Sequence, residues 1–197
     1  MSWFKSILKK EGVGESDWEK KYGGIFQGEM RDGRPHGQGK FVSANGMIVR
    51  EGMWQSGHLH GQGRSEVWDK PHPTKKGYSQ DDNPNPSYWE GNYVHGDLNG
   101  EGVFSGASGK YEGTFANNIQ HGYGRFIPWH GRSVYEGHFI NGKAHGTGTI
   151  RTYDGEVLYS GEWDRNCPTV KLNVPFTGPD QGIWSKDIYK FLLTDEE

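Results

Sequence analysis

Large apolar residues and glycines alternate along this chain in a short pattern that returns six times. Each copy begins with an aromatic or other large residue, continues with a polar residue and a glycine, and places a second large residue two positions after the glycine. The copies lie at residues 26–30, 50–54, 89–93, 111–115, 135–139 and 159–163. Because alternate residues of a strand share one face, this pattern predicts six β-strands, each with an apolar and a polar face.

The glycine at the centre of each copy marks the length of a repeat. These anchor glycines are Gly28, Gly52, Gly91, Gly113, Gly137 and Gly161, so that successive copies are separated by 24, 39, 22, 24 and 24 residues. A regular step in the low twenties is the signature of a repeat array, in which each unit packs against its neighbours.

A second strand follows each anchor glycine within the same repeat. Counted from the anchor glycine as position 0, position +5 is glycine or asparagine in every copy, and positions +9 and +11 are glycine in the first five copies. Asp32-Gly33 and Asn141-Gly142 are residue pairs that favour tight hairpin turns. The sequence therefore predicts a strand, a tight turn and a second strand in each repeat.

The same numbering predicts how the two strands of a hairpin pair. If positions +4 and +5 form the turn, position −2 lies opposite +11 and the anchor glycine lies opposite +9, whereas a longer turn shifts this pairing by one residue. Each large ring at −2 then covers a glycine of the partner strand, which stabilises glycine within a sheet.

Stacking of the hairpins determines the expected fold class. A single hairpin is marginally stable in water, so neighbouring hairpins must pair edge to edge. Five full hairpins and a partial sixth give about twelve strands and a twisted plate or trough about 55 Å long. We expect an all-β protein, an elongated single-layer antiparallel sheet of stacked β-hairpins with short helical caps at both termini.

Composition supports an ordered array and excludes several classes of protein. The chain is 14% aromatic with a net charge of −3, so we expect its burial to come from aromatic rings rather than from an aliphatic core. A pI near 6.3 argues against nucleic-acid binding. The single cysteine, Cys167, excludes an internal disulfide and fits a reducing compartment. Without a signal peptide or a run of about 20 apolar residues, we expect a soluble, cytoplasmic protein.

The pattern divides the chain into five expected segments. Residues 1–21 form an amphipathic N-terminal segment, and residues 22–66 contain the first two repeats. Residues 67–88, rich in proline, aspartate and asparagine, have the composition of an insertion loop, either a plain surface connection or a contact for a partner. Residues 89–167 contain repeats three to six, the last of them partial, and residues 168–197 form a capping segment with a short helix.

Both terminal segments have amphipathic patterns. The N-terminal pattern combines apolar Trp3, Phe4, Ile7 and Leu8 with basic Lys5, Lys9 and Lys10. This short helix could cap the first hairpin, dock onto a partner or lie on a membrane surface. Near the C-terminus Trp184 precedes further apolar residues at helical spacing, and we expect this helix to cover the last repeat, because open sheet edges promote aggregation.

Catalytic and metal chemistry is not expected from the repeated polar residues. His36, His60, His121 and His145 share one phase, but successive copies lie about 10 Å apart, too far for a shared zinc ion. Glu51 with His60, Glu112 with His121 and Glu136 with His145 are expected as structural hydrogen-bonded pairs, because a reaction centre is normally unique. The sequence therefore predicts no enzyme, no cofactor and no metal site.

The repeated unit, Tyr-Glu-Gly-x-Phe followed by x-x-Gly and His-Gly-x-Gly, resembles the MORN (membrane occupation and recognition nexus) repeat over residues 24–66 and 89–167. Departures are Gln27 in the first copy, Arg50 at the aromatic position of the second, Asn99 for histidine in the third and the loss of His-Gly-x-Gly at Pro168. Proteins with such arrays are commonly cytoskeletal, ciliary or membrane-junction organisers, so the resemblance implies a scaffold or assembly subunit.

The implied partner is a peptide or helix of another protein, or a second copy of the chain associating through the sheet ends. The candidate contacts are the face aromatics, which also hold the sheet together, and the C-terminal tryptophan: Trp54, Trp89, Tyr93, Tyr111, Phe115, Tyr135, Phe139, Tyr159, Trp163 and Trp184. The alternative is a peripheral membrane or phosphoinositide-binding protein anchored by its basic N-terminus, which the net negative charge disfavours.

Overall fold

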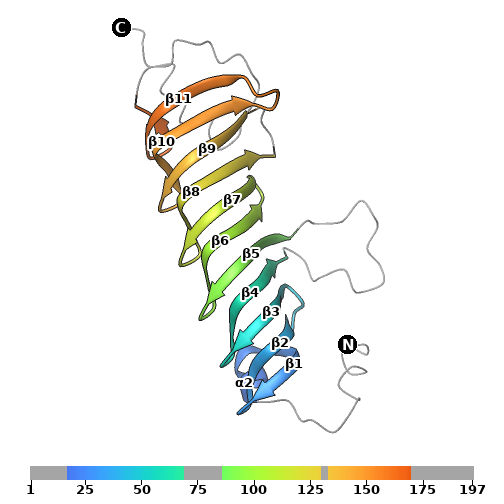
Figure 1. The fold of residues 1–197 in the computed structure, drawn as a ribbon. Helices are drawn as coiled ribbons and strands as arrows, with labels where there is room; N and C mark the ends of the chain where they lie inside the picture. Colours follow the sequence, from blue (N-terminus) through green and yellow to red (C-terminus); the bar gives the residue numbers. More distant parts are fainter. Residues whose placement is uncertain (1–16, 69–85, 130–132, 170–197) are drawn as a thin grey trace, which may run out of the picture.

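A computed structural model describes residues 17–68, 86–129 and 133–169 of the chain. These residues form one short helix and twelve strands, and the strands pair in sequence order in a single antiparallel sheet (Figure 1). The elements are α2 (Asp17–Tyr22), β1 (Gly24–Arg31), β2 (Arg34–Ser43), β3 (Ile48–Gln55), β4 (His58–Val67), β5 (Ser87–Val94), β6 (Asp97–Gly106), β7 (Gly109–Ala116), β8 (Ile119–Pro128), β9 (Ser133–Ile140), β10 (Lys143–Thr152), β11 (Val157–Asp164) and β12 (Cys167–Pro168). The sheet is elongated, twisted and open, as the repeat pattern predicts.

Each hairpin closes through a two-residue turn at positions +4 and +5. Both turn residues have positive φ in every hairpin, from 49° at Arg165 to 96° at Gly96. Two consecutive left-handed residues define the turn type that matches the natural twist of paired strands, and glycine and asparagine adopt it at the lowest cost. The predicted two-residue turn is therefore confirmed.

The predicted strand register is wrong by two residues. In the first hairpin Arg31 pairs with Arg34 beside the turn, yet Gly28 pairs with Gly39 at position +11 rather than with Gly37 at +9. A bulge in the second strand absorbs the extra residues, and Gly37 within it has a φ of 64°. The glycine at +9 thus adopts a left-handed backbone conformation within a bulge. The expected register assumed regular pairing along the whole hairpin and therefore contained no bulge.

Turn-to-strand hydrogen bonds connect successive hairpins at their tips. The +5 amide of one hairpin donates to the +7 carbonyl of the hairpin before it, as from Gly57 to Pro35 and from Gly142 to Gln120, both at 2.9 Å. Where +5 is asparagine, its side chain also accepts from the +7 amide, as Asn118 Oδ1 does from Leu98 N at 2.7 Å. Each turn is thereby fixed to its neighbour, which makes the array one continuous unit.

The helix α2 lies against the first edge of the sheet. Glu19 Oε1 accepts a hydrogen bond from Phe26 N of β1 at 2.8 Å. An edge strand exposes unpaired amides that invite pairing with other chains, and this carboxylate occupies one of them. The helices expected within residues 1–10 and 183–193 lie outside the described residues, and the division of the chain into five segments stays a prediction.

Candidate interaction surface

One face of the sheet, termed here the aromatic face, carries positions −2, 0 and +2 of every repeat. Directly paired residues form a continuous row across it, one from each of the strands β1 to β11. In order, the row is Phe26, Phe41, Arg50, Ser65, Trp89, Phe104, Tyr111, Phe126, Tyr135, Ile150 and Tyr159. Directly opposed side chains are the closest neighbours on a sheet, so the row forms one apolar band of eight aromatic rings and Ile150, interrupted by two polar members.

Glycine makes room for most rings of this row. A Cβ on Gly124 would collide with the hydroxyl and ring of Tyr111, and a Cβ on Gly148 would collide in the same way with Tyr135. The tyrosine hydroxyl passes over these glycines and donates to the carbonyl at position +1, from Tyr111 to Thr114 O and from Tyr135 to His138 O, both at 3.0 Å. The prediction that rings at −2 cover the glycines at +11 is confirmed for Phe26, Tyr111 and Tyr135, although the pairing beneath them is diagonal. It is wrong for Trp89, because the side chain of Leu98 lies beside Gly102 in its place.

The second large residue of each repeat, at position +2, connects neighbouring hairpins. Trp54 packs edge-on against Phe26 at 5.1 Å between ring centroids, and Trp163 packs edge-on against Tyr135 at 5.0 Å. The indole of Trp163 also donates from Nε1 to Gly148 O at 3.0 Å. Edge-to-face contacts at these distances are the favoured geometry of aromatic pairs, so the rings form a lattice that stands in for a second layer.

Most of the aromatic residues expected to contact a partner are buried within this lattice. Trp54, Tyr93, Tyr111, Phe115, Tyr135, Phe139, Tyr159 and Trp163 are each at most 8% exposed. Trp89 is half-buried and lies beside half-buried Phe104, with ring centroids 5.0 Å apart. Trp184 and the expected anchor at Trp3, Phe4, Lys5, Ile7, Leu8, Lys9 and Lys10 lie outside the described residues.

Sequence reasoning did not anticipate which part of the aromatic face stays accessible. Arg50 is exposed, and Ser65, Trp89 and Phe104 beside it in the row are half-buried. Here the row contains a serine where other repeats have a large apolar residue, so Trp89 lacks a ring on one side. The signal was present in the sequence as the departure of the second repeat from the aromatic pattern.

Burial raises the pKa of several tyrosines on the aromatic face. Burial raises the pKa of Tyr93 to about 12, and it also raises the pKa of Tyr111 and of Tyr135. Charged phenolate is disfavoured among apolar neighbours, so these hydroxyls stay protonated and act as hydrogen-bond donors.

These shifts predict instability at alkaline pH. The unfolded chain loses tyrosine protons from the ordinary pKa of 10.0, whereas folded Tyr93 holds its proton to about 12. The free energy of unfolding should therefore be level with respect to these groups below about pH 10 and should fall between about pH 10 and 12. Urea unfolding at about pH 8 and about pH 11 tests this, and the Tyr93→Phe variant should show a shallower decline. Equal declines in the two proteins would contradict the assignment to Tyr93.

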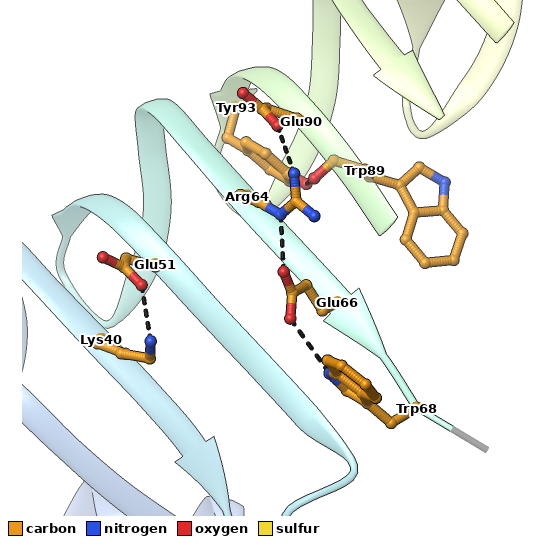
Figure 2. A network of polar contacts seen from close by, with 8 residues as sticks. All are labelled: Lys40, Glu51, Arg64, Glu66, Trp68, Trp89, Glu90 and Tyr93. Carbon is orange, nitrogen blue, oxygen red and sulfur yellow. Dashed lines mark hydrogen bonds and ion pairs between the residues drawn. The ribbon is translucent and has the colours of Figure 1, made fainter. Parts of the chain in front are cut away.

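The opposite face of the sheet carries the polar residues, and strands β2 to β5 hold a network of ion pairs there (Figure 2). Lys40 on β2 pairs with Glu51 on β3 at 2.9 Å. Arg64 on β4 contacts Glu66 on its own strand and Glu90 on β5, both at 2.7 Å. These hydrogen bonds outweigh the effect of burial and raise the pKa of Arg64. Through its contact with Glu90, the guanidinium connects β4 and β5, the two strands on either side of residues 68–86.

The expected glutamate–histidine pairs are wrong. Glu51 pairs with Lys40 instead of His60, and Glu136 accepts from the Tyr123 hydroxyl at 3.0 Å instead of contacting His145. The bulge explains the error, because it moves the +8 residues out of the register in which they would meet position −1. Among the described residues, no group of three or more histidine, cysteine, aspartate or glutamate side chains is arranged to hold a metal ion.

The helix of the described region does not suit a membrane span. With six residues, α2 has neither the length nor the apolar character that a crossing requires, and no other helix occurs in those residues.

Comparisons with known proteins match the repeated hairpins. A family model for the MORN repeat matches residues 26–48, 51–65, 89–110, 111–127 and 135–157, together half of the chain. Alsin from Homo sapiens is 31% identical to this chain over 100 residues, and alsin from Mus musculus and from Rattus norvegicus are 31% and 30% identical over the same length. Those residues are 50% of this chain but 5% of each alsin, so the chain spans a small part of these relatives.

Proposed function

The chain belongs to the MORN-repeat family, and from that premise we propose that it is a non-catalytic scaffold whose aromatic face binds a segment of a partner protein. Repeats of this family are generally modules for interaction with proteins or with membrane lipids, and they are generally not catalytic. The finer assignment, a subunit of a cytoskeletal, ciliary or membrane-associated complex in the cytoplasm, is part of the proposal.

The accessible aromatic pair supports binding on the aromatic face. Trp89 and Phe104 pack ring against ring in the middle of the sheet, and both keep part of their surface open where flanking rings of the row are buried. Partly exposed tryptophan within an apolar surface is the residue type that most often dominates protein interfaces. A bound segment of the partner would cover this pair and extend along the row over the buried rings.

The structural role of the other rings restricts the variants that can test the proposal. Trp163 and Tyr111 are at most 1% exposed, so their replacement would damage the sheet together with any binding surface. Trp89 can be truncated at a smaller cost because it is half-buried.

Truncation of Trp89 is therefore expected to release the partner without unfolding the array. Cross-linking mass spectrometry on the full chain in cells should identify a recurring set of proteins with the natural sequence and lose that set with Trp89→Ala. Trp129→Ala is the matched control, because Trp129 is a 50% exposed tryptophan that follows β8, outside the row. An unchanged set with folded Trp89→Ala, or cross-links confined to the chain itself, would contradict the proposal.

A membrane role is the second candidate, because the family also includes lipid-binding modules and residues 1–10 combine apolar and basic side chains. Sedimentation of the full chain with phosphatidylserine-containing vesicles decides this alternative. Binding that is lost on deletion of residues 1–12 would support it, and absence of binding by the full chain would end it.

A further inference from the structure

Arg50 interrupts the aromatic row at the position where the other repeats place an aromatic ring. The equivalent residues, at position −2, are Phe26, Trp89, Tyr111, Tyr135 and Tyr159. Among the members of the row from β1 to β11, Arg50 is the one with an ionisable cation, and it is exposed.

The neighbours of Arg50 leave its charge uncompensated. Directly opposite it lie Phe41 on β2 and Ser65 on β4, neither of which carries a charge. No carboxylate pairs with Arg50 within the described part of the chain, whereas Lys40 and Arg64 on the polar face each contact a glutamate. The guanidinium is therefore an exposed cation without a counter-charge, in a row whose other members are uncharged.

The field of Arg50 reaches Tyr93 on β5. Burial raises the pKa of Tyr93, and the positive charge of Arg50 opposes that shift. Tyr93 in turn donates from its hydroxyl to Trp89 O at 3.1 Å. Arg50 and Trp89 thus lie in one electrostatic neighbourhood, separated in the row by Ser65 alone.

We propose that Arg50 selects an acidic partner segment, in which a carboxylate pairs with the guanidinium while an adjacent apolar side chain packs on Trp89 and Phe104. A planar guanidinium can bind a carboxylate through two parallel hydrogen bonds, and apolar surroundings strengthen the pair once the partner excludes water. This assignment rests on the proposed function and adds the chemistry of the partner to it.

The proposal commits to a carboxylate on another protein because of charge complementarity. On the opposite face, charged groups of strands β2 to β5 pair with one another, as Lys40 does with Glu51 and Arg64 does with Glu90. A small serine beside Arg50 also leaves space that a ring would otherwise occupy. A neutral or basic segment would bury the guanidinium without a counter-charge, which is strongly unfavourable.

Selection from a random twelve-residue peptide library on the full-length chain tests this inference. We expect the selected peptides to be enriched in aspartate or glutamate beside an aromatic or aliphatic residue. Arg50→Gln should abolish the acidic enrichment and weaken binding of a selected peptide by about tenfold in fluorescence anisotropy. Replacing the peptide's glutamate by glutamine should weaken binding to the natural chain similarly but change binding to Arg50→Gln little. Arg151→Gln, at an exposed arginine of β10 on the polar face, is the matched control and should bind normally.

The outcomes separate this inference from the function on which it rests. Peptides selected without acidic enrichment, or acidic peptides insensitive to Arg50→Gln, would overturn the role of Arg50 and leave the aromatic face as a binding surface. No selection by any form of the chain would contradict the proposed function itself. A third outcome is that acidic peptides bind only to a variant in which Asp195 is replaced by asparagine and Glu196 and Glu197 by glutamine. The chain's own C-terminus would then be the occupant, and the assignment to a partner protein would be wrong.

Discussion

Replacement of Gly113 by alanine is expected to destabilise the array by at least about 3 kcal/mol. A Cβ at this anchor glycine would lie 2.5 Å from Gly124 Cα and 2.5 Å from Tyr123 O, and both obstacles are backbone atoms of the partner strand. The backbone of Gly113 also has a φ of 154°, which side chains of L-residues rarely adopt. Relief of the clash requires separation of β7 from β8, because neither strand can move independently of its other neighbour.

The expected loss for Gly113→Ala can be separated from the cost of its backbone angle. Gly100 also has positive φ, at 87°, but a Cβ there would meet no atom within 4 Å. Gly100→Ala should therefore cost only about 1 to 3 kcal/mol for the backbone conformation. Thermal unfolding followed by circular dichroism should show a midpoint lower for Gly113→Ala by about 6 °C or more relative to the natural chain, and by less for Gly100→Ala. Equal midpoints for the two variants would mean that the close strand approach is not needed.

Sequence patterning predicted the hairpins because each of their determinants is local. The turn residues at +4 and +5 are neighbours in the chain, and pairs such as Asn141-Gly142 adopt the required backbone at low cost. Alternation along one strand is likewise local, and it places the residues at −2, 0 and +2 on the same face. Twelve strands and an open sheet follow once such hairpins repeat.

The register was not predictable from the same local rules. Glycines at +9 and +11 look alike in the sequence, yet Gly37 has a φ of 64° in the bulge whereas Gly39 lies in the regular ladder under the ring of Phe26. Which of the two glycines lies in the bulge depends on where the second strand resumes pairing with the first. The pairing of the whole hairpin decides this, and no single residue does. The same error in register placed the +8 histidines wrongly, so their expected contacts with glutamate were wrong as well.

The accessible part of the aromatic face also depends on information that the repeat pattern does not contain. Tyr111 and Trp89 occupy the same position of their repeats, but Tyr111 is fully buried and Trp89 is half-buried. Two neighbours differ between the repeats. The residue opposite on the preceding strand is Phe104 for Tyr111 and Ser65 for Trp89, and the side chain of Leu98, rather than the ring of Trp89, lies beside Gly91 and Gly102. Departures from the repeat, read with the correct cross-strand partners, therefore indicate the accessible part of this face better than its most regular members do.

Replacement of Trp163 by alanine is expected to have the second large effect, a loss of about 3 to 5 kcal/mol concentrated in the last hairpin. Trp163 is 1% exposed and packs edge-on against Tyr135 at 5.0 Å and Tyr159 at 5.4 Å. Its indole Nε1 donates to Gly148 O on β10, in a bond that is itself buried. Truncation removes the contacts and leaves the carbonyl without this donor, and the strand that follows, β12, has two residues with which to compensate.

The matched control for Trp163→Ala is Trp129→Ala. Trp129 makes the same kind of bond, from Nε1 to Gly106 O at 2.7 Å, but its ring is 50% exposed. If the buried ring lattice stabilises the array, Trp129→Ala should cost about 1 kcal/mol and Trp163→Ala several times more. Hydrogen exchange should show faster exchange in β10 and β11 of Trp163→Ala with β1 to β4 little changed, because each repeat contacts only its neighbours. Equal losses in the two variants would mean that the hydrogen bond, rather than the packing of rings, holds the last hairpin to the sheet.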